Sequence, residues 1–367
     1  MTQKHLDASI EIETDTTGPI RTIQPEEVRR RSAAMERVRH VYAKTRRDKL
    51  LRDAFDELLE DLAERRNGGM NHGPSNRGEG NQLVVLGESG AGKTTAIRRL
   101  LDNHALANGY PRNAPGCKIV TVTAPSPCNL AELGRETSHS LGYTIVRNRI
   151  DGPEVWRIVR ERVRALEILV IHFDEMQHVV QTVNEIEMQK IRNVLKGLLV
   201  DERYPIGLII SGTPLTVRLV HPDRQVARRG RWIELPPLSI GADSKMVGSF
   251  ITQLAKEAEL EFDESEQHQV VPRLLHAGTY QLGVVAEEIH NAIRVALRSS
   301  AAGLTLKHFG DAFANRTGNL APWNPYFASN WVDLDATRVL VTSETAYCSD
   351  ANTSSLNGTR GKSGGKK

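Results

Sequence analysis

The sequence has few cysteines, few aromatic residues and no long apolar run. Only three of its 367 residues are cysteines, and 5% are aromatic. Three cysteines without a C-x-x-C pair cannot all form disulfides, so we expect free thiols and a cytoplasmic protein. No stretch approaches the roughly 20 apolar residues that span a bilayer, and the first residues lack the apolar segment of a secretory signal. We therefore expect no association with a membrane.

A strong charge of one sign is also missing. The 48 basic and 45 acidic residues leave a net charge of +3, which is too small to indicate nucleic-acid binding by itself. In contrast, 39% of the residues are hydrophobic, which provides for a real core and excludes wholesale disorder. The length exceeds one minimal domain and predicts two or three folded units of about 150 residues each.

Shifts in composition along the chain indicate its domain boundaries. Apolar residues at three- and four-residue steps predict amphipathic helices, and a stretch rich in Gly, Asn, Pro and Ser predicts a linker. Arg and Lys, Arg47 among them, are placed on the polar faces of the N-terminal helices, beside several Glu. The expected segments are a disordered leader (1–22), an N-terminal helical segment (23–66), a linker (67–80), an α/β domain (81–237), a small helical domain (238–316), and an extended, partly disordered tail (317–367).

Strand-like and helix-like segments alternate through the α/β domain, which predicts a parallel sheet covered by helices on both faces. The expected strands are 82–86, 118–122, 168–173, 206–210 and 232–235. The expected helices between them are 94–107, 130–141, 154–166 and 185–199. The strand signal then stops, and four further helices are expected at 243–260, 264–276, 282–298 and 306–316.

The segment Gly87–Thr94 matches G-x-x-x-x-G-K-[ST], directly after the first expected strand and at the start of a helix. Glycines allow the backbone N–H groups to surround phosphate oxygens, and the helix N-terminus adds a positive field. Lys93 is expected to reach the β- and γ-phosphates of ATP, and Thr94 to bind Mg²⁺. A glycine-rich turn without a ligand is the alternative. The predicted binding residues are Gly87, Glu88, Ser89, Gly90, Ala91, Gly92, Lys93, Thr94 and Thr95.

Two acids, Asp174 and Glu175, follow the expected strand 168–173. Asp174 is predicted to hold Mg²⁺ and Glu175 to deprotonate the attacking water. Adjacent acids favour hydrolysis over phosphoryl transfer to a metabolite. Zinc is not expected at the flanking His172 and His178, because no further spaced Cys or His completes four ligands.

Polar residues also follow the next two strands. Ser211 or Thr213 could contact the γ-phosphate or position water, since strand C-termini line the ligand crevice of a parallel sheet; a simple turn is the alternative. Before the last strand lie Arg228, Arg229 and Arg231. One of these arginines could act on the nucleotide of a neighbouring subunit, or they could form a solvated basic turn.

The motifs GESGAGKTT, LVIHFDE, ISGTP and QVARRGRWIELPPL occur in this order before a helical region. The chain resembles AAA+ ATPases over roughly residues 25–316, and among them the TniB/TnsC-like ATP-binding proteins of transposons. The resemblance implies ATP-bound homo-oligomers that assemble on DNA without sequence specificity and recruit or activate a transposase. It also implies that Arg229 is the arginine that acts in trans. One departure is Gln281, which stands where many AAA+ lids carry an arginine.

Two alternatives remain open, one for the function and one for the tail. A helicase-loader or signalling ATPase that acts on a protein partner is the alternative to a transposition regulator. In the tail, the aromatic residues Trp323, Tyr326, Phe327 and Trp331 could cap the helical domain or form a docking peptide for a partner.

Overall fold

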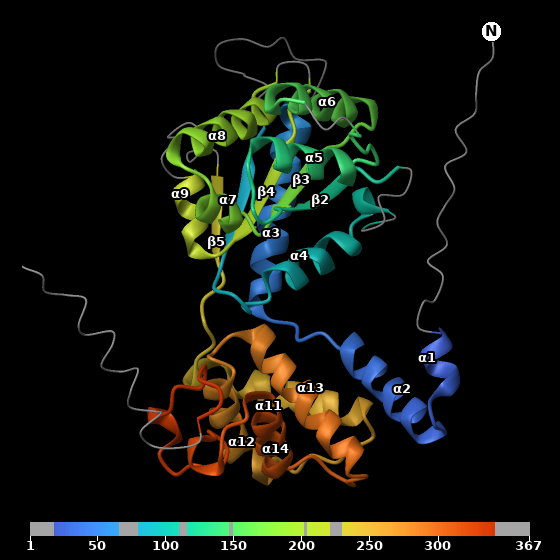
Figure 1. The fold of residues 1–367 in the computed structure, drawn as a ribbon, viewed down its shortest axis with the longest axis vertical. Helices are drawn as coiled ribbons and strands as arrows, with labels where there is room; N and C mark the ends of the chain where they lie inside the picture. The colour runs from blue at the N-terminus through green and yellow to red at the C-terminus, as the bar shows by residue number, and fades with distance from the viewer. Residues whose placement is uncertain are drawn as a thin grey trace, which may run out of the picture. The chain divides into compact units, whose positions relative to one another are not determined.

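The computed structural model describes residues 18–65, 80–108, 110, 116–146, 150–201, 204–220 and 230–341. Two compact units, which we call the sheet unit and the helical unit, divide the chain (Figure 1). The sheet unit comprises residues 44–239 and 278–285. The helical unit contains the chain up to residue 43, residues 240–277, and the chain from residue 286 onward.

Five parallel strands form the sheet, in the order β2-β3-β4-β1-β5. Their carboxyl ends share one edge of the sheet, where β1 and β3 flank β4. This arrangement confirms the predicted α/β fold with a parallel sheet, and each strand lies within a few residues of its predicted position. The strands are β1 (Gln82–Leu86), β2 (Ile119–Thr123), β3 (Val170–Asp174), β4 (Gly207–Gly212) and β5 (Gly230–Glu234).

Helices cover both faces of the sheet, because alternate side chains of each strand enter different cores. Leu83 and Val85 pack with α3 (Arg46–Arg65) and α4 (Lys93–Asp102) on one face. Val84 and Leu86 pack on the other face. The helices of that face are α5 (Leu130–Ser140), α6 (Gly152–Ala165) and α8 (Glu185–Leu199). Burial on both sides explains why the strands read as continuous apolar runs.

The starts of α5, α6 and α8 follow from their N-cap residues. Asn129, Asp151 and Asn184 each accept a hydrogen bond from the backbone N–H three residues on, at 2.8–2.9 Å. The helix predicted at 94–107 instead ends at Asp102, because His104 has an extended backbone and caps a new turn. The remaining short elements are η1 (Ala105–Ala107), α7 (Gln177–Thr182), η2 (Pro214–Thr216) and α9 (Val217–Val220).

The helical unit contains the four helices predicted after the sheet. In addition to α1 (Gly18–Ile23) and α2 (Glu26–His40), its elements are α11 (Ile240–Glu257), α12 (Glu264–Ala277), α13 (Leu282–Arg298), α14 (Leu306–Thr317), η3 (Ala321–Trp323) and η4 (Trp331–Asp333). The first residues of α13, up to Val285, group with the sheet unit. Among the described helices, none combines the length and the apolar character needed to cross a bilayer.

The helical segment expected at 23–66 is divided between the two units. Phe55 of α3 enters the core formed with β1, whereas α2 is joined to the end of α11. There, the Arg37 guanidinium donates to the Glu257 carbonyl and pairs with Glu259 at 2.7 Å. Of the expected linker, only Gly80 lies within the described residues.

The segment after α14 packs onto the helical unit through its aromatic and amide side chains. Tyr326 is 1% exposed and contacts the rings of Phe309 and Phe313. The buried Asn324 donates a 2.8 Å hydrogen bond to the Gly310 carbonyl, and Trp331 packs edge-on against His276. These contacts are those of a cap on the helical unit, which is one of the two alternatives for the aromatic residues. Residues 342–367 lie outside the described part.

Candidate active site

The phosphate-loop motif connects β1 to α4 in a conformation that requires glycine. Gly90 has a φ of +78° and Gly92 a φ of +87°, values that a side chain disfavours. The Gly90 carbonyl accepts a 2.7 Å hydrogen bond from the Gly283 N–H, and a Cβ at Gly90 would lie 2.5 Å from Val284 Cγ2. Gly92 is the N-cap of α4, so the first N–H groups of this helix face the loop without intrahelical partners. This is the geometry of an anion site at a helix N-terminus.

Lys93 lies over the loop, held by backbone carbonyls. Its Nζ donates to the carbonyls of Gly87 at 2.8 Å and Glu88 at 3.0 Å. Burial lowers the pKa of Lys93 below that of a free lysine, and the carboxylates of Glu175 and Asp174 oppose this shift. The buried ammonium is thus held at the loop by two charge-assisted hydrogen bonds.

Asp174, at the end of β3, meets Thr94 of the loop as the motifs predicted. The Thr94 hydroxyl donates to Asp174 Oδ2 at 2.7 Å, and the Ser211 hydroxyl donates to Oδ1 at 2.5 Å. Burial raises the pKa of the Asp174 carboxyl, but the proximity of His172 and the donated hydrogen bonds outweigh burial and lower it overall. An ionised carboxylate beside a hydroxyl is an oxygen ligand pair that fits Mg²⁺.

A chain of buried hydrogen bonds leads from β2 to this carboxylate. It joins Tyr110 to Thr121 at 2.8 Å, Thr121 to His172 Nδ1 at 3.1 Å, and His172 Nε2 to Ser211 at 2.7 Å. Burial lowers the pKa of His172 to about 4, so its ring is neutral at pH 7. Because Ser211 donates to Asp174, Ser211 must accept from the Nε2–H of His172, and the Nδ1 of His172 accepts from Thr121. Each of the five side chains then has a hydrogen-bond partner, and every hydrogen bond in the chain is donated toward the Asp174 carboxylate.

This chain was not predicted from the sequence, which considered His172 only as a possible zinc ligand. Parallel pairing puts Thr121 opposite His172, and the signal that could have suggested contact is a polar residue in each of two neighbouring apolar strands. The other flanking histidine, His178, contacts the Ala124 carbonyl through Nδ1. Within the residues that the structure describes, no group of three or more metal-binding side chains is present.

Glu175, the predicted base, lies in the left-handed region with a φ of +58°. A non-glycine residue there costs about 1–2 kcal/mol, and such backbone strain is concentrated at functional sites. The Gln177 Nε2 donates a short hydrogen bond to Glu175 Oε2, while Gln177 Oε1 accepts from the Thr213 N–H at 3.1 Å. Gln177 therefore connects Glu175 to the turn after β4. The sequence analysis did not find Gln177, because its two partners follow different strands.

The two residues predicted after β4 have different surroundings. Ser211 is fully buried and bonded to Asp174, so its hydroxyl is directed at the carboxylate. Thr213 lies one residue past β4 and contacts Gln177 through its backbone. Ser211 and Thr213 both lie at the sheet edge that carries Asp174, as expected for the carboxyl ends of neighbouring parallel strands.

The predicted arginines are only in part within the described residues. Arg231 on β5 pairs with Glu57 and, at 3.6 Å, with Asp61, both on α3. Arg228 and Arg229 lie outside the described residues, so the role of Arg229 in trans stays a prediction.

Two further residues at the loop were not predicted to take part in the site. Arg47, counted among the solvated basic residues, is 8% exposed, and it donates to the carbonyls of Ala91 at 3.4 Å and of Pro236. Gln281 is buried beside Gly90, and its Oε1 lacks a hydrogen-bond partner among the described residues. An orphaned buried acceptor is costly. Its presence here fits a site that a donor group of a bound nucleotide would complete.

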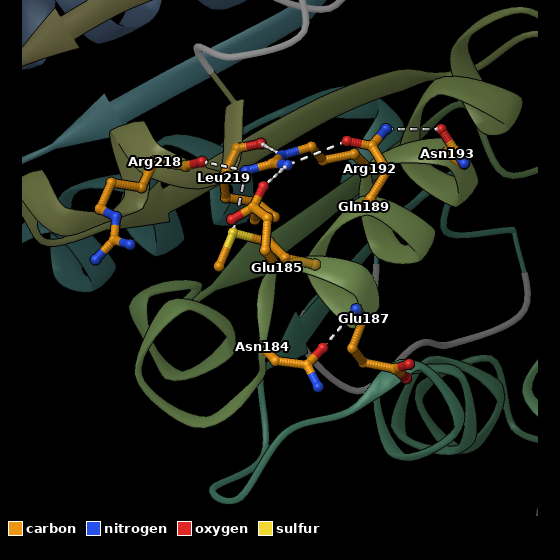
Figure 2. A network of polar contacts seen from close by, with 9 residues as sticks. Asn184, Glu185, Glu187, Gln189, Arg192, Asn193, Arg218 and Leu219 are labelled. Atoms are coloured by element: carbon orange, nitrogen blue, oxygen red, sulfur yellow. Dashed lines mark hydrogen bonds and ion pairs between the residues drawn. The ribbon is translucent and has the colours of Figure 1, made fainter.

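Arg192 of α8 fixes the chain that follows Thr213. Its guanidinium donates to the carbonyls of Arg218 at 2.7 Å and Leu219 at 2.9 Å, and pairs with Glu185 at 2.5 Å (Figure 2). The side chain is 4% exposed, so it satisfies the last carbonyls of α9 in a place that water does not reach. This anchor holds α9 directly before the segment that contains Arg229.

Comparison with known proteins identifies the family to which the chain belongs. The family model of the bacterial TniB protein matches residues 36–240, more than half of the chain. None of the curated proteins compared with the chain matches it.

Solved structures resemble the chain at low sequence identity, so they show the fold alone. The ORC1 protein of Aeropyrum pernix in complex with DNA has a TM-score of 0.52 at 15% identity, covering 75% of this chain and 66% of that one. Cdc6p from Pyrobaculum aerophilum has a TM-score of 0.52 at 14% identity, covering 76% of this chain and 70% of that one. Drosophila ORC bound to DNA has a TM-score of 0.52 at 12% identity, covering 86% of this chain and 70% of that one. The chain thus spans about two thirds of the length of these proteins. The family match and the arrangement of the sheet lead to one conclusion, that the chain belongs to the bacterial TniB family and has the fold of AAA+ P-loop ATPases.

Proposed function

We propose that the protein binds ATP with Mg²⁺ at the phosphate loop and hydrolyses it. The observation that carries this proposal is the contact of the Asp174 carboxylate with the Thr94 hydroxyl at 2.7 Å, directly after the loop that holds Lys93. A loop that requires glycine, a buried ammonium and an oxygen ligand pair thereby occur together at one edge of the sheet.

Each residue has a separate task in this reaction. Lys93 and the N–H groups at the start of α4 bind the β- and γ-phosphates, and Thr94 and Asp174 hold the metal ion. Bound Mg²⁺ supplies positive charge to the phosphates. Glu175 accepts the proton of the attacking water. Thr213, after β4, contacts the γ-phosphate or the water.

The test uses Glu175→Gln, which keeps the shape of the side chain and removes the base. ATP should bind with native affinity, while single-turnover hydrolysis should fall by about 100-fold or more. The matched control is Glu161→Gln, an exposed residue on α6 that pairs with Arg157. Native turnover in a folded Glu175→Gln protein would refute the assignment of the base.

We further propose that the ATP-bound protein forms a homo-oligomer on DNA and recruits a transposase. Membership of the TniB family supports this proposal, as does the likeness in fold to ORC proteins that were solved on DNA. In such an assembly Arg229 acts on the nucleotide of the neighbouring subunit, where an arginine stabilises charge in the transition state.

Mixing two inactive variants tests the arrangement in trans. Arg229→Ala and Glu175→Gln proteins should each be inactive, yet mixed assemblies should regain part of the hydrolysis at interfaces that carry both intact groups. If the two variants co-assemble but hydrolysis is not restored at any mixing ratio, each chain completes its own active site. ATP-dependent assembly without any DNA binding would favour instead a helicase-loader or signalling ATPase that acts on a protein.

A further inference from the structure

A groove of about 530 Å³ lies within the helical unit, between the N-terminal helices α1 and α2 and the end of α13. Its charged lining is almost entirely basic. The lining includes five arginines and one glutamate, which are Arg21, Arg31, Arg39, Arg294, Arg298 and Glu36. We call these five arginines and the space between them the arginine groove.

The acidic residues nearby neutralise only part of this charge. Arg21 pairs with Glu36 at 3.0 Å, and Arg31 lies 3.8 Å from Glu27. Arg39 and Arg298 have no ion pair among the described residues, and Arg294 donates to the neutral amide of Asn291 at 2.8 Å. Three of the five guanidinium groups therefore remain available to an anion.

The available arginines are also held close together. The pKa of Arg294 is lowered by burial and by the positive charges of Arg39 and Arg298. One turn earlier on the same face of α13, burial and the charges of Arg39 and Arg294 lower the pKa of His290, whose buried Nε2 lacks a hydrogen-bond partner among the described residues. The exposed Glu287 opposes the shift of Arg294 only in part, so like charges remain gathered here, and a bound anion would relieve their repulsion.

The spacing of the cations fits a chain of phosphates. Arg31 and Arg39 are eight residues apart on α2, about 12 Å along the helix, and Arg294 and Arg298 are one turn apart on α13. An array of this length exceeds a single phosphate or carboxylate. The cations are all arginine, whose planar fork of N–H groups matches phosphate oxygens in pairs, whereas lysine acts as a point charge.

We propose that the arginine groove binds the phosphodiester backbone of nucleic acid without reading its bases. The proposal rests on the DNA binding proposed above and assigns a surface to it, on the helical unit and apart from the phosphate loop. Contacts to phosphates fix a protein on a duplex and carry no sequence information.

The experiment compares two double variants of the full chain that remove the same charge. Arg39→Gln with Arg298→Gln alters the groove. Arg29→Gln with Arg30→Gln alters residues of α2 that do not line it. Fluorescence anisotropy with a random 30-base-pair duplex is recorded over a range of salt concentrations, in the presence of a slowly hydrolysed ATP analogue. Hydrolysis of ATP without DNA is measured in parallel.

The groove variant should bind the duplex at least tenfold more weakly at 100 mM salt. Its slope of log K against log salt should be smaller by about 2, because two phosphate contacts are lost. The control variant should stay within about twofold of the native protein, and both should hydrolyse ATP as before. If the double groove variant does not fold, the single variant of the exposed Arg298 replaces it, with an expected change in slope of about 1.

Native affinity and slope in the folded groove variant would overturn the inference and leave the proposed DNA binding intact. Retained DNA binding together with lost binding of poly-L-glutamate would also overturn it, and would assign the groove to an acidic protein segment. A native protein that hydrolyses ATP but binds no duplex would refute both this inference and the proposed function on DNA.

Discussion

The side-chain amide of Gln177 donates a hydrogen bond to the carboxylate of Glu175. The other end of the same amide accepts from the backbone of Thr213 at 3.1 Å. The proposed base and the turn after β4 are therefore connected through one side chain, which is 6% exposed. A movement of Thr213 toward a phosphate would be transmitted to Glu175 directly.

Replacing Gln177 with Ala should reduce kcat for ATP hydrolysis by about 10- to 100-fold, because the base loses its fixed position. KM for ATP should change by less than about threefold, since no predicted phosphate contact is removed. Steady-state kinetics of Gln177→Ala and of the exposed control Gln189→Ala separate the two constants. Faster hydrolysis than in the native protein would mean that Gln177 restrains the base and does not position it.

Ser211→Ala should weaken the proposed magnesium site. The substitution removes the 2.5 Å hydrogen bond to Asp174 and leaves the Nε2–H of His172 without its acceptor. The expected loss of stability is about 1–3 kcal/mol. The Mg²⁺ concentration for half-maximal hydrolysis should rise several-fold, which a titration of activity with Mg²⁺ measures. Ser249→Ala on α11 is the control, and an unchanged Mg²⁺ requirement in Ser211→Ala would contradict the role of this chain of hydrogen bonds.

Lys93→Ala should lower the affinity for ATP by 100-fold or more, because the ammonium that meets the phosphates is removed. Calorimetry or a fluorescent nucleotide measures the affinity, and thermal melting confirms that the variant is folded. Lys190→Ala removes an exposed lysine of α8 and should bind ATP as the native protein does. Equal affinity in all three proteins would refute the phosphate-loop assignment.

We expect Glu288 to make the helical unit less stable at pH 7 and above than at acidic pH. Burial raises the pKa of Glu288 from 4.5 to about 7, although its ion pair with Arg316 opposes the shift and Glu287 adds to it. Between these values the folded protein holds a proton that the unfolded chain releases. The stability from this proton is complete below pH 4.5 and is lost as the pH rises to 7. At pH 8 the loss is about 3 kcal/mol, at about 1.4 kcal/mol per unit.

Glu288→Gln should therefore narrow the difference in melting temperature between pH 5 and pH 8. The variant carries no titrating group at this site, so it should gain stability over the native protein mainly at pH 8. Melting curves of both proteins at the two pH values test the sign, with Glu264→Gln, an exposed residue of α12, as control. If the melting temperature differs between pH 5 and pH 8 by as much in the variant as in the native protein, the expected effect of Glu288 is wrong. Tyr326, whose pKa Glu288 raises further, stays protonated throughout this range.

The segment after α14 offers a comparison of two truncations. Removing residues 342–367 should leave the melting temperature unchanged, because the capping contacts that the structure describes lie before Thr342. Removing residues 318–367 should lower it by many degrees, since Tyr326 and Asn324 are fully buried. The substitution Tyr326→Ala alone should cost about 3–5 kcal/mol. If the protein ending at Thr317 melts like the native one, these aromatic residues are free to dock a partner.

Sequence patterns predicted the sheet and the loop because both depend on local signals. Strands buried on two faces read as apolar runs, and the phosphate loop is contiguous in the chain. Gln177 could not be found this way, because its bond to the Thr213 N–H forms only once β3 and β4 are paired. The separation of α2 from α3 also escaped prediction, since an amphipathic pattern shows that a face is buried but not against which partner.

The hydrogen bond between Gly283 and Gly90 has a consequence for synthesis on the ribosome. Translation completes the phosphate loop and all five strands of the sheet long before it reaches Gly283, so one wall of the loop is still missing from the nascent chain at that stage. A chaperone or a nucleotide that meets the emerging protein therefore encounters an incomplete loop. For the same reason, an expression fragment that ends with the family match at residue 240 would contain every motif of the site and yet lack the residues that close it.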